Sequence, residues 1–258
     1  MPRKTTTAAR LARLGFADPA RAELLIGDLA VDGGQAEDSL IDALSTAADP
    51  DLALAALARL PRDAELARAL AEDPRLRGRL AAVLGASAAL GDHLARHPGH
   101  WRVLAGADDL PAPAVQQVRA ELLAAVGARP GDPEPVAGVT GGSAAAAGAA
   151  AGETDGRGAP GPVAALRVAY RRRLLALAAR DLTGEASLDQ VAAELADLAA
   201  AALEAALAIA RANLPPGSAP CRLAVIAMGK CGARELNYAS DVDVIFVAEP
   251  GTGPAEDG

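Results

Sequence analysis

Two aspartates near the end of the chain, Asp241 and Asp243, are the residues best suited to chemistry. Val242 lies between them and the apolar run 244–247 follows, a pattern that predicts a β-strand. In a strand, residues two apart point to the same face, with Cα atoms about 6.5 Å apart. Two carboxylates that close are unfavourable unless a cation lies between them. Magnesium ions, which take carboxylate and phosphate oxygens, meet this requirement and are what in-line nucleotidyl transfer needs.

A glycine-rich turn precedes the aspartates and predicts a phosphate site. Gly229 follows a short apolar run, and Gly232 lies three residues further on. Glycine lets the backbone approach a ligand, and the free N–H groups of a helix N-terminus bind phosphate oxygens. Lys230 stands where its ammonium group can join them. The turn is not a Walker A loop, because the spacing of that motif is absent.

Residues 215–258, which must position the aspartates and the glycine turn, have the pattern of the start of an α/β domain. Leu223, Val225 and Ile226 predict a first strand, 230–238 has weak helical character, and 242–247 predicts the second strand. Two strands and one helix do not form a stable sheet domain alone. The sequence therefore looks truncated.

The region before it predicts helices. Asp18-Pro19, Asp49-Pro50 and Asp73-Pro74 each place an N-capping carboxylate before a proline at the first helical position. Residues 1–126 therefore read as a helical region, with apolar positions at helical spacing that include Leu24, Leu25 and Leu29. Residues 127–162, rich in glycine, proline and alanine, predict a flexible insert. Residues 163–214 predict two long helices, the second with a stripe that begins at Leu188 and ends at Ile209.

Composition limits the class of partner. The chain has 258 residues and a formal net charge of −8, which argues against DNA or RNA as the main ligand. No segment offers the roughly 20 strongly apolar residues of a membrane span. Its two cysteines form no disulfide framework or zinc pattern, which favours a cytoplasmic protein. His93 and His97 are four residues apart and could share a helical face, but we expect no zinc site from this pair.

The order of strand, glycine turn, short helix, Ser-Asp-x-Asp and strand resembles the DNA polymerase β-like nucleotidyltransferase superfamily. The residues between 227 and 243 resemble one family more specifically, the glutamine synthetase adenylyltransferase family. The stretch that carries this resemblance is Ala227-Met228-Gly229-Lys230-x-Gly232-x-Arg234-Glu235-Leu236-Asn237-Tyr238-x-Ser240-Asp241-x-Asp243. Upstream stretches around Leu14-Gly15-Phe16, Ser87 to His97-Pro98 and Arg180-Asp181-Leu182 resemble its helical N-terminal region. Cys231 departs from the usual aliphatic residue and Ala233 from a common glycine.

The resemblance implies a fold, a site and partners. It implies a mainly α N-terminal region followed by a truncated nucleotidyltransferase domain. Members remove AMP from a tyrosine of glutamine synthetase by phosphorolysis in their N-terminal half, giving ADP, and add AMP from ATP in their C-terminal half. The motif's position matches the adenylyl-removing half. By position, Asp241 and Asp243 bind Mg²⁺, and Gly229, Lys230, Gly232 and Ser240 shape the phosphate pocket.

The same resemblance implies features outside this chain. A third metal-binding carboxylate is expected on a later strand, so the fragment is expected to be inactive alone. Glutamine synthetase is the implied partner, and a PII-type nitrogen regulator is a possible second one. Two other classes stay open: another polymerase β-like nucleotidyltransferase, and a non-catalytic helical interaction module.

Overall fold

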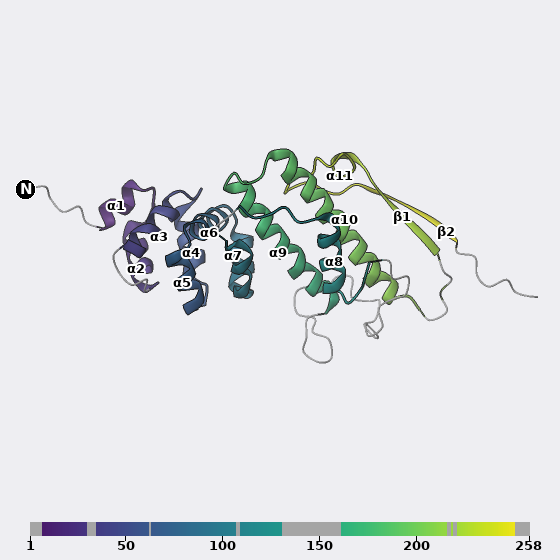
Figure 1. The fold of residues 1–258 in the computed structure, drawn as a ribbon, viewed down its shortest axis with the longest axis horizontal. Helices are drawn as coiled ribbons and strands as arrows, with labels where there is room; N and C mark the ends of the chain where they lie inside the picture. Colours follow the sequence, from purple (N-terminus) through teal and green to yellow (C-terminus); the bar gives the residue numbers. More distant parts are fainter. Residues whose placement is uncertain are drawn as a thin grey trace, which may run out of the picture. The chain divides into compact units, whose positions relative to one another are not determined.

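Helices make up most of the structure, and one small sheet follows them (Figure 1). The computed structural model describes residues 7–29, 35–61, 63–106, 109–130, 161–215, 218 and 221–250. The helices before residue 130 are α1 (Thr7–Arg13), α2 (Pro19–Asp28), α3 (Gln35–Ser45), α4 (Pro50–Ala58), α5 (Ala64–Glu72), α6 (Pro74–Ala86), α7 (Ala88–Arg96), the 3-10 helix η1 (Pro98–Leu104) and α8 (Val115–Ala125). They are followed by α9 (Pro162–Leu182), α10 (Leu188–Ala212), β1 (Cys221–Ala227), α11 (Gly229–Ala233) and β2 (Val244–Pro250). The predicted mainly helical character is confirmed.

The three predicted Asp-Pro helix starts are confirmed. Asp18 accepts a hydrogen bond from the Arg21 N–H at 3.0 Å, and Asp49 accepts one from the Leu52 N–H at 2.9 Å. Asp73 caps α6 by accepting from the N–H of Arg75 and that of Leu76. In each case a proline follows as the first helical residue, where its missing N–H costs no hydrogen bond.

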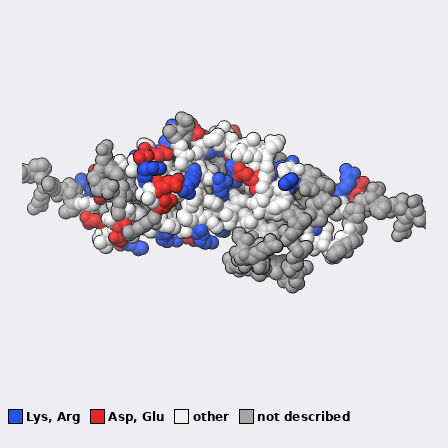
Figure 2. Space-filling view, turned by 60° about the horizontal axis from the view of Figure 1, so that its bottom comes forward, with Lys and Arg blue, Asp and Glu red and all other residues white. Residues whose placement is uncertain are grey.

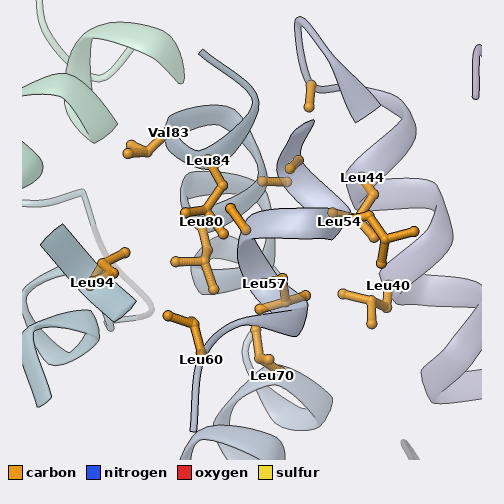
Figure 3. Close-up of a cluster of buried hydrophobic side chains, with 14 of the residues drawn as sticks. Leu40, Leu44, Leu54, Leu57, Leu60, Leu70, Leu80, Val83, Leu84 and Leu94 are labelled. Atoms are coloured by element: carbon orange, nitrogen blue, oxygen red, sulfur yellow. The ribbon is translucent and has the colours of Figure 1, made fainter. Parts of the chain in front are cut away.

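The chain forms two compact units. The first comprises residues 1–111 and 174–187, and its core is a continuous cluster in which most side chains are leucine or alanine. Within this core, helix α4 packs on α6, and α3 contacts both helices. Figure 3 shows Leu54 and Leu57 of α4 with Leu80 and Leu84 of α6 in this cluster. All four side chains are almost fully buried.

The second unit comprises residues 112–173 and 188–258. Helix α8, which the sequence groups with the helices before it, packs here on α10. Val118 and Leu122 of α8 are buried, as are Leu195 and Leu198 of α10. Arg119 and Glu204 form an ion pair between the same two helices, with Nη2 to Oε1 at 2.6 Å.

The sheet consists of β1 and β2, which pair antiparallel (Figure 1). Val225 lies opposite Phe246, and Ile226 lies opposite Ile245. Helix α11 contacts both β1 and α10. Phe246 and Ile245 stay exposed despite their apolar side chains. The described strands are thus the two expected from sequence, and they make no further sheet among the described residues.

Two leucines expected on apolar helix faces are exposed instead. Leu24 was expected on the apolar face of α2 but its side chain is 72% exposed, and Leu188 is 81% exposed at the first residue of α10. Both expectations are wrong because the helix faces that become covered depend on the neighbouring helices. Most of the expected flexible insert, residues 131–160, lies outside the described residues.

The surface of the described residues carries both signs of charge. On the face drawn in Figure 2, acidic and basic side chains lie next to one another instead of gathering by sign. Many are paired: Arg59 with Asp92, and Arg173 with Glu121, for example. Within the described ranges, none of the helices combines the length and the apolar character required to cross a bilayer.

Candidate functional site

The glycine turn and the second aspartate lie against each other. The backbone N–H of Met228 donates to the carbonyl oxygen of Asp243 at 2.9 Å, which ties the end of β1 to the residue before β2. A Cβ atom placed on Gly229 would stand 3.3 Å from Oδ2 of Asp243. Gly229 also has φ of +52°, a left-handed conformation that glycine adopts readily. The fold therefore brings Gly229 and Asp243 together.

The aspartates lead into the strand instead of lying within it. Strand β2 begins at Val244, so Asp241, Val242 and Asp243 form the segment immediately before it. The predicted strand began two residues too early. Both aspartates are exposed, and the contacts of Gly229 involve Asp243, the nearer of the two to the sheet.

Gly232 has a packing role that the sequence did not suggest. A Cβ atom on this residue would stand 2.4 Å from the carbonyl oxygen of Ala227, closer than real contacts of this kind. The missing side chain thus lets α11 fold back against the end of β1. Gly232 therefore sets the path of the turn.

Lys230 and Ser240 occupy opposite ends of the same segment. Lys230 lies in α11 with an exposed side chain, and its carbonyl oxygen accepts from the N–H of Glu235 at 2.8 Å. Ser240 is half-buried and donates its hydroxyl to Oδ1 of Asn237 at 2.9 Å. The same oxygen accepts from the N–H of Ala239 at 3.0 Å. Asn237 therefore shapes the loop that leads to Asp241.

Arg234 is the site feature that sequence reasoning missed. Its guanidinium binds the carboxylate of Asp197 on α10 through two hydrogen bonds of 2.6 and 2.8 Å. Asp197 precedes Arg234 by 37 residues. No local sequence pattern predicts an ion pair between residues so far apart in the chain. The Asp197–Arg234 pair becomes visible only when α11 packs on α10.

The two departures from the family pattern are explained by packing. Cys231 is 6% exposed, and burial raises the pKa of its thiol, so it behaves as a small apolar residue. Ala233 is the last residue of α11, and the left-handed residue is the next one, Arg234, with φ of 61°. Ala233 therefore needs no left-handed conformation, which Arg234 adopts instead.

The histidines form a second cluster of titratable groups, in the first unit. His100 joins His93 and His97, and Nε2 of His93 lies 2.9 Å from Nδ1 of His100. Sequence spacing had pointed only to His93 and His97. Across the residues that the structure describes, no set of three or more histidine, cysteine, aspartate or glutamate side chains is arranged to hold a metal ion.

Comparisons with known proteins give the family. A family model described as glutamate-ammonia ligase adenylyltransferase matches residues 149–258. The chain is 48% identical over 264 residues to a Streptomyces avermitilis protein named bifunctional glutamine synthetase adenylyltransferase/adenylyl-removing enzyme, covering 98% of this chain and 23% of that protein. Proteins of the same name from Streptomyces coelicolor and Mycobacterium avium are each 46% identical, over 99% and 92% of this chain. No solved structure matches the chain.

The similarity extends over both described units and includes the turn and the aspartates. The chain spans 23% of the length of the two Streptomyces relatives and 22% of the Mycobacterium avium protein. It belongs to the glutamine synthetase adenylyltransferase/adenylyl-removing enzyme family.

Proposed function

We propose that this chain is part of the adenylyl-removing half of a cytoplasmic enzyme that regulates glutamine synthetase. Residues 215–258 would begin a polymerase β-like nucleotidyltransferase domain, and the helical region would precede it. The full-length protein would also add AMP from ATP in its other half. The observation that supports this proposal is the approach of the Gly229 turn to Asp243: the Met228 N–H donates to the main-chain carbonyl of Asp243, and a Cβ on Gly229 would crowd its Oδ2 atom. This arrangement would put a phosphate-binding turn beside a metal-binding acid.

The residues present suit a magnesium ion. Asp241 and Asp243 are exposed carboxylates, and oxygen ligands of this kind are those that Mg²⁺ prefers. A Cβ atom on residue 229 would crowd Oδ2 of Asp243. Because Gly229 has no Cβ, this carboxylate oxygen stays open on the side of the turn. Bound there, magnesium would polarise phosphate oxygens and neutralise developing charge. A third carboxylate would come from the remainder of the longer protein, as the family resemblance implies.

The chain's own residues would bind and orient the phosphates. The Lys230 ammonium group would neutralise phosphate charge beside the turn, and Gly232 would keep the turn against β1. Ser240 and Asn237 would hold the loop that carries Asp241. In the reaction, an orthophosphate oxygen would form a bond to the phosphorus of AMP as the bond from that phosphorus to the tyrosine oxygen breaks. The products would be ADP and the free tyrosine of glutamine synthetase.

The partners follow from the same proposal. Adenylylated glutamine synthetase would be the macromolecular substrate, and a PII-type regulator is a candidate for controlling the direction of the reaction. The names of the relatives support the first of these.

The test is phosphorolysis by the full-length protein. Asp241→Asn and Asp243→Asn should each lower the rate of ADP release from adenylylated glutamine synthetase by at least about 100-fold, because several kcal/mol of charge stabilisation are lost. Glu249→Gln is the matched control, since Glu249 is an exposed acid on β2 that faces Arg222 at 3.5 Å. Unchanged rates in both aspartate variants would overturn the assigned site. Transfer of AMP to or from another class of substrate would instead indicate a different nucleotidyltransferase.

A further inference from the structure

Arg234 adopts a backbone conformation that its side chain does not favour. It follows α11 directly as its C-cap, with φ of 61° and ψ of 37°, and it is the non-glycine residue with positive φ among those the structure describes. For an L-residue other than glycine this region is unfavourable by about 1–2 kcal/mol. The conformation needs a compensating interaction, and the bidentate pair with Asp197 supplies one.

Asp197 is held in place by the helix that carries it. It lies in α10 between Ala196 and Leu198, both buried, and its own side chain is only 14% exposed. A carboxylate so nearly buried requires a charged partner. Arg234 meets that need with two parallel hydrogen bonds, a geometry that a lysine cannot reproduce. The pair therefore fixes both the distance and the orientation of the turn relative to α10.

The turn that Arg234 closes is the turn that touches Asp243. The N–H of Arg234 donates to the carbonyl oxygens of Lys230 and Cys231, so its position sets the end of α11. The beginning of α11 is Gly229, which lies against Oδ2 of Asp243. Any shift of Arg234 therefore moves Lys230 and Gly229 relative to the aspartates.

We propose that Arg234, through its pair with Asp197, is a positioning residue for the nucleotidyl site, so that α10 sets the place of the phosphate-binding turn. This inference rests on the function proposed above. Arg234 does not act on the substrate itself, because two of its guanidinium nitrogens are committed to Asp197. Its effect reaches the phosphate through Lys230 and the backbone of the turn.

The experiment separates positioning from simple stabilisation in the full-length protein. A pair that only stabilises the fold lowers the amount of active enzyme, and thus the apparent kcat, while the KM of folded molecules stays the same. A positioning pair changes KM for orthophosphate. We expect Arg234→Lys and Asp197→Asn each to raise that KM by about tenfold with a smaller effect on kcat. The direction for Asp197→Asn is diagnostic, because removal of a negative charge alone would lower the KM for an anion.

The double variant and a matched pair complete the test. Asp197→Asn combined with Arg234→Lys should raise KM no more than either change alone, since both remove one interaction. Arg119→Gln and Glu204→Gln are the controls, because that ion pair also anchors on α10 but does not reach the turn. They should leave KM within about twofold of the wild-type value.

Each outcome decides the inference. Wild-type KM in both Arg234 and Asp197 variants would overturn it, provided that Asp241→Asn and Asp243→Asn are inactive. Active aspartate variants would reject the proposed function instead. Failure of all Arg234 and Asp197 variants to fold would also count against the inference, because the pair would then be a determinant of folding.

Discussion

Arg79 and Glu185 form a buried, bidentate ion pair although they are 106 residues apart in sequence. The Nε and Nη2 atoms of Arg79 donate to the two carboxylate oxygens of Glu185 at 2.7 and 3.0 Å. The Nη1 atom of Arg79 donates to the carbonyl oxygens of Leu104 and Gly106, both at 3.0 Å. The pair therefore joins α6, the end of η1 and the connection between α9 and α10 within the first unit.

Breaking this pair should destabilise the first unit strongly. Glu185→Gln leaves the Arg79 guanidinium, only 1% exposed, without its counter-charge. Removing one partner of a buried ion pair costs about 3–5 kcal/mol. The measurement is urea unfolding followed by far-ultraviolet circular dichroism. Asp92→Asn provides the control, because the Arg59–Asp92 pair is exposed and such pairs contribute about 0–1 kcal/mol. Equal losses in the two variants would show that burial does not govern the effect.

The same pair should make stability depend on acid pH. Burial alone raises the pKa of Glu185, but hydrogen bonds from Arg79, the Leu110 N–H and the Thr183 hydroxyl outweigh it, so the pKa is lower than the ordinary value of 4.5. A carboxyl with a lowered pKa in the folded state contributes stability above its unfolded pKa. That contribution is lost as the pH falls below 4.5 and through the folded pKa.

The lowered pKa of Glu185 predicts how the stabilities of wild type and Glu185→Gln compare as the pH falls. Urea midpoints measured from about pH 7 to about pH 3 should converge for wild type and Glu185→Gln as the pH falls, because the wild-type carboxyl becomes neutral. A constant difference between the two proteins across that range would contradict the assignment of the acid dependence to Glu185.

The two cysteines should differ sharply in reactivity. Cys231 is buried and the pKa of its thiol is raised by burial, whereas Cys221 is exposed at the start of β1. The thiolate is the reactive form of cysteine. Burial therefore protects Cys231 in two ways, because it blocks access to the sulfur and disfavours the thiolate. A colorimetric thiol reagent should modify one cysteine quickly in the native chain and both in denaturant. Cys221→Ser should abolish the fast phase, and a fast phase that survived this change would place Cys231 in contact with solvent.

Two glycines of α6 should respond in opposite ways to the same substitution. A Cβ on Gly78 meets no atom within 4 Å, whereas one on Gly85 would stand 2.6 Å from Cβ of Ala47 and 2.9 Å from the carbonyl oxygen of Asp49. Gly78→Ala should raise the free energy of unfolding by about 0.5–1 kcal/mol. Gly85→Ala should lower it by about 1–3 kcal/mol through overcrowding. Urea midpoints of the two single variants provide the check, and a stabilising Gly85→Ala would refute the close packing of α6 against the α3–α4 connection.

The sequence alone determined the features that arise within a few residues. The helix starts at Asp18, Asp49 and Asp73 were predictable because an N-cap bond joins a side chain to an N–H two or three residues later. The candidate site was found in the same way, since its motif occupies one short stretch and matches a family by its letters. The mainly helical character followed from the Asp-Pro starts and the helical spacing of apolar residues, both of which are local patterns.

Only the tertiary structure decided which groups meet across long separations. The exposure of Leu24 and Leu188 depends on which helices cover each face, and periodicity does not contain that information. The constraint on Gly232 comes from one carbonyl oxygen at the end of β1, and the strand start at Val244 was decided by pairing with Ala227. The ion pairs of Asp197 with Arg234 and of Arg79 with Glu185 form because packed helices bring distant charges together in partly buried places, where each requires the other.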